Sequence, residues 1–360
     1  MSATFGNKIK VTLFGRSHAP EIGAVVEGLP AGMKISEERL SDFMERRRAK
    51  SALATARKEA DKVIFESGVA DGITDGSPVR LVIKNTNVRS QDYKDISYVV
   101  RPSHADFSAF VKYAGQYDPR GGGQFSGRLT AAMCAAGFLC LEMLKGKGIE
   151  VVSHVSRVGD VEDEKLNALI ADKELNAKLT SCDFPVISEE AKDKMAQCIL
   201  GAKAEGDSVG GEIECAVYNL PAGLGGDFFG GLEALIASAI FSIPAVKGIE
   251  FGAGFEFAQM YGSQANDGFI IDESGKIITE TNNCGGILGG ISSGMPLTFK
   301  TAFKPTPSIA KPQKSVDIKE KKEVVLEIKG RHDPCIVPRA AAVIEAVTAI
   351  ALVNADGFCI

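Results

Sequence analysis

The most informative stretch for the fold is "SGRLTAAMCAAGFLCLEMLKGKG", residues 126–148. Apolar and small residues fill all of its turns, which is typical of a helix buried in a core rather than lying on a surface. We expect this helix to end at Gly146. A second stretch of the same kind, "VPRAAAVIEAVTAIALVNADG" over residues 337–357, predicts another buried helix that ends before Gly357.

Two other stretches alternate apolar and polar residues with the period of two that indicates a half-buried strand. They are "SPVRLVIKN" (residues 77–85) and "GGEIECAVYNL" (residues 210–220). No fixed repeat and no Ser/Pro-rich linker divides the chain. The pattern predicts an α/β or α+β fold with antiparallel strands and helices, organised as a single domain over residues 1–360.

The composition disfavours several classes of protein. The 360 residues are 45% hydrophobic and 24% charged, which are values of a globular protein. A net charge of −5 argues against a nucleic-acid binder, because such proteins usually carry a basic surplus. The eight cysteines include no CxxC pair, so reduced thiols are favoured over a disulfide framework or a zinc site.

The same features lead us to expect a soluble, cytoplasmic protein without membrane contact. The stretch "MSATFGNKIKVTLFG" holds no signal-peptide core of useful length. The most apolar run, "AAAVIEAVTAIALVNA", directly follows Arg339, contains Glu345, and is shorter than a bilayer requires.

A basic run closes a third predicted helix, "SEERLSDFMERRRAK" (residues 36–50), for which Ser36 is the expected N-cap. Arg46, Arg47 and Arg48 carry no interleaved aromatic residues. We interpret them first as a solvated helix end, where cations are favoured. They could alternatively bind an anionic small molecule through paired hydrogen bonds. A nucleic-acid patch is the weaker interpretation.

Two of the four histidines stand in settings that suit proton transfer. His18, in "LFGRSHAPEIG", and His104, in "RPSHADF", each follow a Ser in a loop-like stretch beside an Arg. An imidazole there can titrate near neutral pH and pass protons. His154, in the apparent strand "VVSHVSR", is interpreted as structural. No HExxH, HxxxH or Cys/His cluster supports a metal site.

Several glycine-rich stretches lie beside polar and basic residues, where backbone can approach a ligand closely. In "YAGQYDPRGGGQFSGRLTA" (residues 113–131), three glycines precede a helix and either bind phosphate or form a tight turn. "NNCGGILGGISSG" (residues 282–294) and "KPTPSI" (residues 304–309) either line a cofactor or form surface loops. In "KGRHDPC" (residues 329–335), Asp333 could be a base, could orient another group, or could be a helix N-cap.

Together these stretches resemble the chorismate synthase family. "GRSHAPEIGAVVEGLPAG" is similar to the family's first signature, which normally reads GESHG, and residues 101–131 are similar to its second block. "SIPAVKGIEFGAGF", "NNCGGILGGISSG", "KPTPSI" and "GRHDPC" follow in the family's order. The ordered blocks run from about Phe14 to the terminal helix, and they are more specific than any single glycine motif.

The resemblance implies an α+β fold with a β-α-β sandwich core, assembled as a homotetramer. It also implies a lyase that removes phosphate and the C6 pro-R proton from 5-enolpyruvylshikimate 3-phosphate to give chorismate. Such a reaction requires reduced FMN without net redox change. An external flavin reductant is therefore expected, with NADPH acting only as an indirect reductant.

The resemblance further assigns roles to individual residues. His18, His104 and Asp333 match catalytic positions: the histidines serve near the flavin and the substrate phosphate, and the aspartate assists proton transfer to flavin N5. The positions expected to bind FMN are Gln124, Phe125, Ser126, Gly289, Lys304, Pro305, Thr306, Pro307, Ser308 and Arg331. The positions expected to bind substrate are Ser17, Arg47, Arg48, Arg101 and Arg128.

Three positions depart from the family pattern. Arg16 stands where the family has Glu, Ala19 where it has Gly, and Gln124 where it has an Arg that some branches replace. A guanidinium close to His18 would lower the pKa of that imidazole and weaken its proton donation at neutral pH.

Three alternatives accompany this interpretation. The first is a family member whose activity Arg16 impairs, and the second is an NADPH-dependent flavin oxidoreductase, although the chain lacks the GxGxxG fingerprint. The third is a non-enzymatic module that binds anions or nucleic acid.

Overall fold

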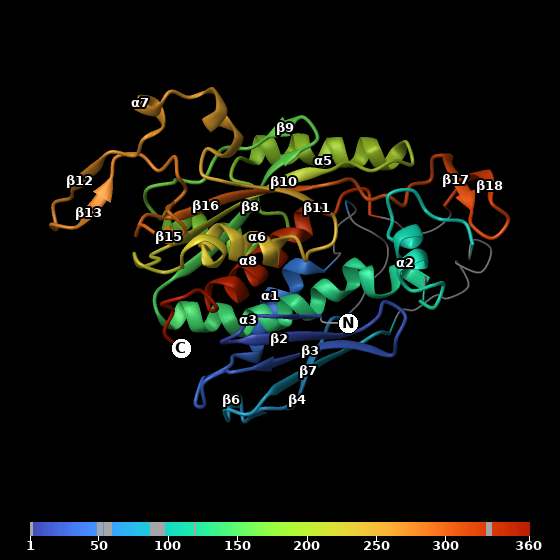
Figure 1. Cartoon of the computed structure of the whole chain (residues 1–360), viewed down its shortest axis with the longest axis horizontal. Coiled ribbons are helices and arrows are strands. Elements are labelled where there is room, and N and C mark those ends of the chain that lie inside the picture. The colour runs from blue at the N-terminus through green and yellow to red at the C-terminus, as the bar shows by residue number, and fades with distance from the viewer. Residues whose placement is uncertain (1–2, 49–52, 54–59, 87–97, 119, 329–332) are drawn as a thin grey trace.

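Two buried helices form the centre of the computed structural model, and a sheet covers each side of them (Figure 1). The structure describes residues 3–48, 53, 60–86, 98–118, 120–328 and 333–360. The central helices are α3 (Thr130–Gly146) and α8 (Val337–Leu352), and most of their side chains are buried. Both buried helices predicted from the sequence are therefore confirmed, including the end of the first at Gly146.

Small residues let α3 and α8 approach each other closely. A Cβ added to Gly137 of α3 would lie 2.5 Å from the Cβ of Ala346 on α8, and equally close to the Ala346 carbonyl oxygen. Real atoms do not approach that closely, so a larger side chain at position 137 would force the two helices apart. The small-residue composition of this stretch is therefore a requirement of helix packing.

The two sheets are each five-stranded, with the orders β1-β2-β3-β7-β4 and β11-β16-β10-β8-β9, and every pairing among their described strands is antiparallel. The first comprises β1 (Thr4–Phe5), β2 (Lys10–Gly15), β3 (Glu21–Glu27), β7 (Val79–Lys84) and β4 (Val63–Ser67). The second comprises β11 (Val246–Phe251), β16 (Leu297–Phe303), β10 (Gly211–Tyr218), β8 (Glu150–Val158) and β9 (Val161–Glu162). The α+β class and the β-α-β sandwich are thus confirmed.

The other described helices lie at different places around the central pair (Figure 1). Helix α1 (Glu37–Arg47) packs on α3 and α8, and its first turn is capped because the Arg39 backbone N–H donates to Ser36 Oγ at 3.2 Å. The rest are α2 (Asp106–Lys112), α4 (Lys173–Ser181), α5 (Glu189–Ala204), α6 (Leu232–Ile240) and α7 (Gly262–Ala265). Among the described residues, four short hairpins pair β5 (Val69–Ala70) with β6 (Ile73–Thr74), β12 (Phe269–Ile271) with β13 (Ile277–Thr279), β14 (Ile287–Leu288) with β15 (Ile291–Ser292), and β17 (Gln313–Asp317) with β18 (Lys322–Leu326).

One large hydrophobic cluster joins these layers. Its buried side chains come from both sheets and from α1, α3, α6 and α8, and they run along the chain from Ile9 to Phe358. The single domain over residues 1–360 stays a prediction, which this shared core supports.

The basic run at the end of α1 differs from its first interpretation. Arg46 and Arg47 are each only 6% exposed, so they are not a solvated helix end. Arg46 donates to both carboxylate oxygens of Glu345 on α8, at 2.6 and 2.7 Å, and Ser153 of β8 also donates to Glu345 through its hydroxyl at 2.9 Å. This buried ion pair ties α1, α8 and β8 together. Its charged groups can be buried because each has a hydrogen-bonded partner.

The fold bears on three expectations from the sequence, which concern the cysteine thiols, metal sites and membrane-spanning helices. All eight cysteines are free thiols. The described residues contain no group of His, Cys, Asp and Glu suited to hold a metal ion. By length and composition alone, one helical stretch (Arg120–Gly146) could cross a membrane, and 78% of its most apolar window is buried inside the protein. Such burial is that of a core helix.

His154 of β8 is fully buried between two carboxylates, which agrees with its structural interpretation. Its Nδ1 lies 3.0 Å from Asp163 Oδ2 and its Nε2 lies 2.8 Å from Glu214 Oε2. The carboxylates also accept backbone N–H groups, including that of Leu166 at 2.8 Å from Glu214. Burial by itself would lower the pKa of His154, but the bonds to Asp163 and Glu214 outweigh burial and raise it above 6.5.

This cluster predicts a pH-dependent contribution to stability. Because the pKa of His154 is higher in the folded state than its ordinary 6.5, its contribution is complete below pH 6.5 and is lost as the pH rises through the folded value. We expect the difference in free energy of unfolding between the natural chain and His154→Gln to shrink from pH 6 to pH 9, measured by urea denaturation. A difference that stays constant over this range would show that His154 is neutral in the fold.

Candidate active site

His18 rests against the turn of three glycines. It lies between β2 and β3, and the backbone N–H of Ser17 donates to the carbonyl oxygen of Gly123 at 3.1 Å. A Cβ added to Gly121 would lie 2.6 Å from His18 Nδ1 and 2.8 Å from Ser17 Oγ. Gly121, Gly122 and Gly123 all have positive φ angles, of 58°, 85° and 54°, which glycine adopts at little cost. The loop of Gly121, Gly122 and Gly123 therefore packs against His18 and Ser17, and a side chain at position 121 would clash with both.

His104 reaches the next glycine of the same loop. A Cβ on Gly122 would lie 3.8 Å from His104 Cε1 and 3.6 Å from the Cβ of Ser126. His104 Nε2 also lies 3.3 Å from the hydroxyl oxygen of Ser308. Two histidines that are 86 positions apart in the sequence thus lie beside consecutive glycines, and both are half-buried. Half-buried imidazoles can exchange protons with a ligand while other parts of the ring stay packed.

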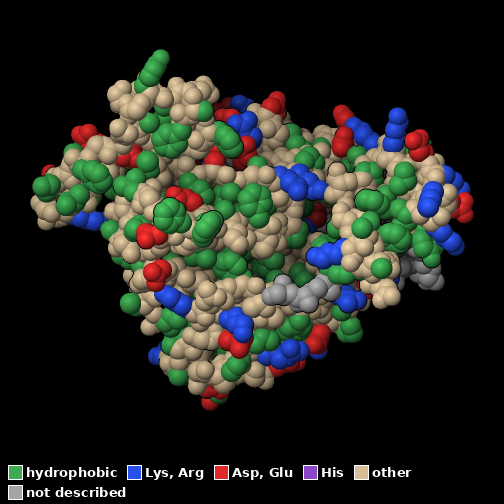
Figure 2. Space-filling view, viewed as in Figure 1, with side chains coloured by type: hydrophobic (Ala, Val, Ile, Leu, Met, Phe, Trp, Pro, Cys, Tyr) green, Lys and Arg blue, Asp and Glu red, His purple; other side chains and the backbone are tan. Residues whose placement is uncertain are grey.

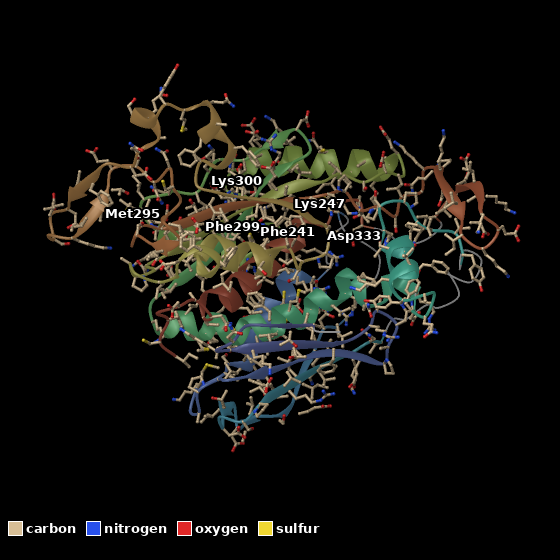
Figure 3. All side chains as sticks on the ribbon, viewed as in Figure 1. Phe241, Lys247, Met295, Phe299, Lys300 and Asp333 are labelled. Atoms are coloured by element: carbon tan, nitrogen blue, oxygen red, sulfur yellow. The ribbon has the colours of Figure 1, made fainter. Side chains whose placement is uncertain are left out.

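The predicted cofactor stretch 304–308 is fastened beside His104. Lys304 Nζ donates to the carbonyl oxygen of Ser103 at 2.5 Å. Ser103 has a φ of 56°, a conformation unusual for a residue with a side chain, and it directly precedes His104. Burial and the neighbouring Lys247 lower the pKa of Lys304. Figure 3 shows Lys247 and Asp333 on the α2 side of Phe241 and Phe299, and Figure 2 shows Lys and Arg side chains bordering a hollow on this face.

A buried carboxylate joins two of the predicted substrate arginines. Asp61 is 3% exposed and accepts hydrogen bonds from Arg47 Nη1 at 2.8 Å and from Arg128 Nη1. Burial by itself would raise the pKa of Asp61, but Arg47 and Arg128 outweigh burial and hold it below 3.8. Arg47 further donates to Thr130 Oγ1 at 2.9 Å and to the Gly127 carbonyl at 3.1 Å. All three side-chain nitrogens of Arg47 therefore have protein partners. Through Gly127 and Thr130, Arg47 holds the segment that directly follows the glycine loop.

Arg128 connects this cluster to the His18 loop through Asn85. Arg128 Nε donates to Asn85 Oδ1 at 2.9 Å, and Asn85 Nδ2 donates to the Ala19 carbonyl at 2.7 Å. The backbone N–H of Asn85 also donates to the carbonyl oxygen of Pro20 at 2.9 Å. A chain of hydrogen bonds thus runs from the buried ion cluster to the segment that carries His18, and it fixes where that segment lies.

Arg101 is held by a carboxylate of its own. Its Nε and Nη2 each donate to Asp106 at 2.7 Å, and Asp106 is the first residue of α2. Burial would raise the pKa of Asp106, but the bonds from Arg101 outweigh burial and lower it. The backbone N–H of His104 donates to the Arg101 carbonyl at 3.2 Å, so this pair also fixes His104.

Asp333 contacts the first turn of α8, but not as its N-cap. Arg339 Nη2 donates to Asp333 Oδ2 at 2.5 Å, whereas the N-cap of α8 is Ile336, whose side chain makes no capping bond. Burial lowers the pKa of Arg339, although Asp333 opposes this effect, and the charges of Arg47 and Asp61 also act on Arg339. The N-cap interpretation of Asp333 is therefore wrong. Arg339, which holds Asp333, is itself within electrostatic reach of the Arg47–Asp61 cluster.

Two buried hydroxyls in these segments lack partners. Among the described residues, neither Ser17 Oγ nor Thr306 Oγ1 has a hydrogen-bond partner. A buried polar group without a partner is costly unless a ligand or water supplies one. Both hydroxyls belong to the residues predicted to bind substrate or cofactor, so the site fits a polar ligand.

Other predicted residues are placed as follows. Gln124 Nε2 donates to the Tyr113 hydroxyl at 3.0 Å, and the Phe125 side chain is 40% exposed. Arg48 pairs with Glu45 at the end of α1. Gly289 lies in the β14–β15 hairpin, which Figure 1 shows at the opposite end of the molecule from α2, so one chain does not bring it to the histidines. Arg331 lies outside the described residues. Pro305 and Pro307 restrict the backbone on either side of Thr306.

Asp61 and Asn85 are the residues that the sequence analysis missed. Neither belongs to a recognisable motif, because their partners lie far away in the chain. Asp61 and Arg128 are 67 positions apart, and Asn85 and Ala19 are 66 apart. The one local signal is that each residue lies close to a strand end, Asp61 before β4 and Asn85 directly after β7.

Comparisons with known proteins agree with one another. A family model described as chorismate synthase matches residues 9–356. The chain is 46% identical to the chorismate synthase of Pyrococcus abyssi over 97% of this chain and 96% of that protein. It is 44% identical to that of Dehalococcoides mccartyi over 98% of this chain and 96% of that protein. A crystal structure of chorismate synthase superposes with a TM-score of 0.75 at 30% identity, covering 97% of this chain and 92% of that one.

The close packing of His18 on Gly121 predicts that a methyl group at position 121 displaces the imidazole. Gly121→Ala places a side chain at a φ of 58° and into the His18 ring, so we expect a loss of roughly 1 kcal/mol or more in stability. The His18 ring signals in NMR spectra should also shift. Gly127→Ala is the matched control, because a Cβ there meets no atom within 4 Å. Unchanged His18 signals in Gly121→Ala would contradict the packing described here.

The Asp61 cluster predicts a second effect on stability. Asp61→Asn removes the charge that Arg47 and Arg128 share, so we expect the free energy of unfolding to fall by about 3–5 kcal/mol in urea titrations. Asp71→Asn is the control, since Asp71 has nearly the same φ (49° against 48°) but is exposed. Equal losses in the two variants would mean that backbone conformation, not the ion cluster, sets the cost.

Proposed function

The chain belongs to the chorismate synthase family, and from this premise we propose that the segments around His18 and His104 bind reduced FMN together with the substrate. The activity itself follows from the family. The protein is a carbon–oxygen lyase that converts 5-enolpyruvylshikimate 3-phosphate into chorismate with release of phosphate, in the shikimate pathway to aromatic amino acids. Family membership replaces the flavin oxidoreductase and the non-enzymatic binding module as interpretations.

The observation that carries the proposed site is the position of both histidines beside one glycine loop. His18 lies against Gly121, and His104 lies near Gly122 and Ser308. Two proton-transfer groups beside one loop can serve two parts of one bound ligand pair. His18 would then move a proton at the leaving phosphate, while His104 and Asp333 would hold protons on the cofactor side.

The residues present fit FMN. The flavin side of the site would be formed by Ser126, by the Lys304–Ser308 stretch and by Asp333, with the buried hydroxyl of Thr306 available to donate or accept a hydrogen bond. Reduced FMN would supply electron density to the substrate ring as phosphate leaves, without net redox change. Lys304, partly buried, offers a positive charge for a phosphate or for an anionic ring. Ser17, Arg101 and Arg128, which adjoin the histidine segments in sequence or through hydrogen bonds, would face the anionic substrate.

The cation arrangement suits a substrate with several negative charges. Arg101 and Arg128 are fixed by Asp106, Asp61 and Asn85, so they would not need to reorganise when an anion binds. Preorganised charges of this kind stabilise developing charge better than mobile ones. A locally cationic site within a chain of net charge −5 can still attract an anion, because a recessed site focuses the field of its nearest charges.

We also propose a homotetramer that is cytoplasmic and receives reduced flavin from an external reductant, with NADPH acting only indirectly. Large exposed aromatic side chains support assembly: Phe228, Phe229 and Phe255 are 91%, 100% and 83% exposed. Such side chains are normally covered by a partner. Light scattering after gel filtration measures the mass directly, and a mass of about one chain of 38.1 kDa would contradict the tetramer.

The proposed site is tested by an anaerobic assay. Protein, 5-enolpyruvylshikimate 3-phosphate and dithionite-reduced FMN should release phosphate and form chorismate, while oxidised FMN should give none. We expect His18→Ala and His104→Ala each to lower kcat by about 10²- to 10⁴-fold, the range for loss of a general acid or base. Ser308→Ala, which removes only the hydroxyl beside His104, should have a smaller effect.

Arg39→Gln is the control for this series, since Arg39 is exposed and pairs with Glu142 near the far end of α3. Full activity of both histidine variants would contradict the proposed roles. If the natural chain binds flavin and substrate without turnover, and Arg16→Glu restores turnover, then Arg16 impairs the enzyme.

A further inference from the structure

A small recess lies beside the His18 loop and is separate from the contacts between the two histidines and the glycines. Its lining residues are Arg16, Tyr113, Gln116, Tyr117, Asp118 and Gln124. Its volume of about 30 Å³ is greater than the roughly 10–15 Å³ that one water molecule needs. The recess therefore has room for a small ligand.

The hydrogen-bonding groups of most lining residues are already used. Arg120 holds both oxygens of Asp118, through Nε and Nη2 at 2.9 Å each. The Tyr117 hydroxyl donates to the carbonyl oxygen of Asp106 at 3.0 Å. The negative charge of Asp118 is therefore matched by Arg120, and it does not compensate a second cation.

Arg16 and Gln116 differ from their neighbours. In the part of the chain that the structure describes, neither side chain has a hydrogen-bond or ion-pair partner. A guanidinium carries five N–H donors in a planar fork, and an amide adds two more. The unused groups of the recess are thus mainly donors, with one uncompensated positive charge. An oxyanion is the class of ligand that matches this set.

The recess is also within reach of His18. Arg16 is separated from His18 only by the buried residue Ser17, and the backbone of Asp118 lies against Gly123 of the loop that seats His18. The bonds from Arg120 lower the pKa of Asp118, and the charge of His18 contributes to the same shift. An anion bound by Arg16 would therefore change the electrostatic potential at the His18 ring.

We propose that Arg16 and Gln116 form a binding site for a free oxyanion, with inorganic phosphate as its ligand. Arg16 and Gln116 are not among the substrate and cofactor positions named above, although Gln124, which also lines the recess, is one of the positions expected to bind FMN. The proposed function supplies the phosphate, because the reaction releases one beside His18, and this assignment of its source rests on that function. The binding itself does not depend on activity. Since Arg16 is exposed, binding should weaken as ionic strength rises.

The binding test uses the full chain without flavin or substrate. Inorganic phosphate is titrated while calorimetry records the affinity and NMR records the histidine ring signals. We expect saturable binding that shifts the His18 signals. Arg16→Gln should bind phosphate about tenfold more weakly, which is the loss of one charge-assisted contact. Arg39→Gln, which removes the same charge far from the recess, should bind as the natural chain does.

Phosphate binding of equal strength in Arg16→Gln and the natural chain would overturn the proposal. So would ring shifts that follow His104 and leave His18 unmoved. Because the protein carries no flavin in this test, an inactive chain can still bind phosphate. A failure of the proposed function is therefore distinguishable from a failure of the phosphate site. Circular dichroism with equal melting temperatures shows that both variants are folded.

Kinetics separate free phosphate from the substrate's own anionic groups. If the recess takes free phosphate, added phosphate should inhibit turnover, and Arg16→Gln should relieve that inhibition while KM stays unchanged. If Arg16 instead contacts the substrate, Arg16→Gln should raise KM while phosphate inhibition stays the same. The second result would overturn the proposal and would make Arg16 a substrate-binding residue.

Discussion

The close crossing of α3 and α8 is the constraint on which the site depends. Gly137 and Ala346 leave no space for a side chain between the helices, so the two helices cannot shift relative to each other without losing contact. The first turns of both helices carry site residues. Thr130 of α3 accepts a bond from Arg47, and Arg339 of α8 holds Asp333. Because the two helices cannot shift, the site residues bonded to their first turns are also held in place.

Each of four buried arginines around this core is bound to a carboxylate. Arg46 has Glu345, Arg101 has Asp106, and Arg47 and Arg128 share Asp61. Each pair removes the cost of a lone buried ion, and removing one member leaves the other uncompensated. The pairs also fix direction, because a guanidinium bound on two nitrogens can no longer rotate freely. The basic character of the site is thus built from arginines whose positions are set before any ligand arrives.

Local patterns in the chain predicted the parts of the fold that depend on neighbours. The buried helices, the strand over residues 211–218 and the cap at Ser36 all follow from periodicity or from the chemistry of one turn. The same reasoning failed for the arginines at the end of α1. A cation at a helix terminus is usually solvated, and only Glu345, 299 positions from Arg46, makes its burial possible. The cap alternative for Asp333 fails for a similar reason, since its partner is a side chain beyond the helix start.

The buried helices, the strands, the family and the residue types available for proton transfer could be predicted from the amino-acid sequence, because periodicity, glycine turns and ordered motifs are properties of neighbouring residues. The tertiary structure decided which of those residues meet. It brings His18 and His104 to consecutive glycines, joins Asp61 to two arginines, keeps Gly289 apart from them within one chain, and leaves Arg16 and Gln116 to line a recess. These contacts join residues tens to hundreds of positions apart, and only the packing of helices between sheets sets such distances.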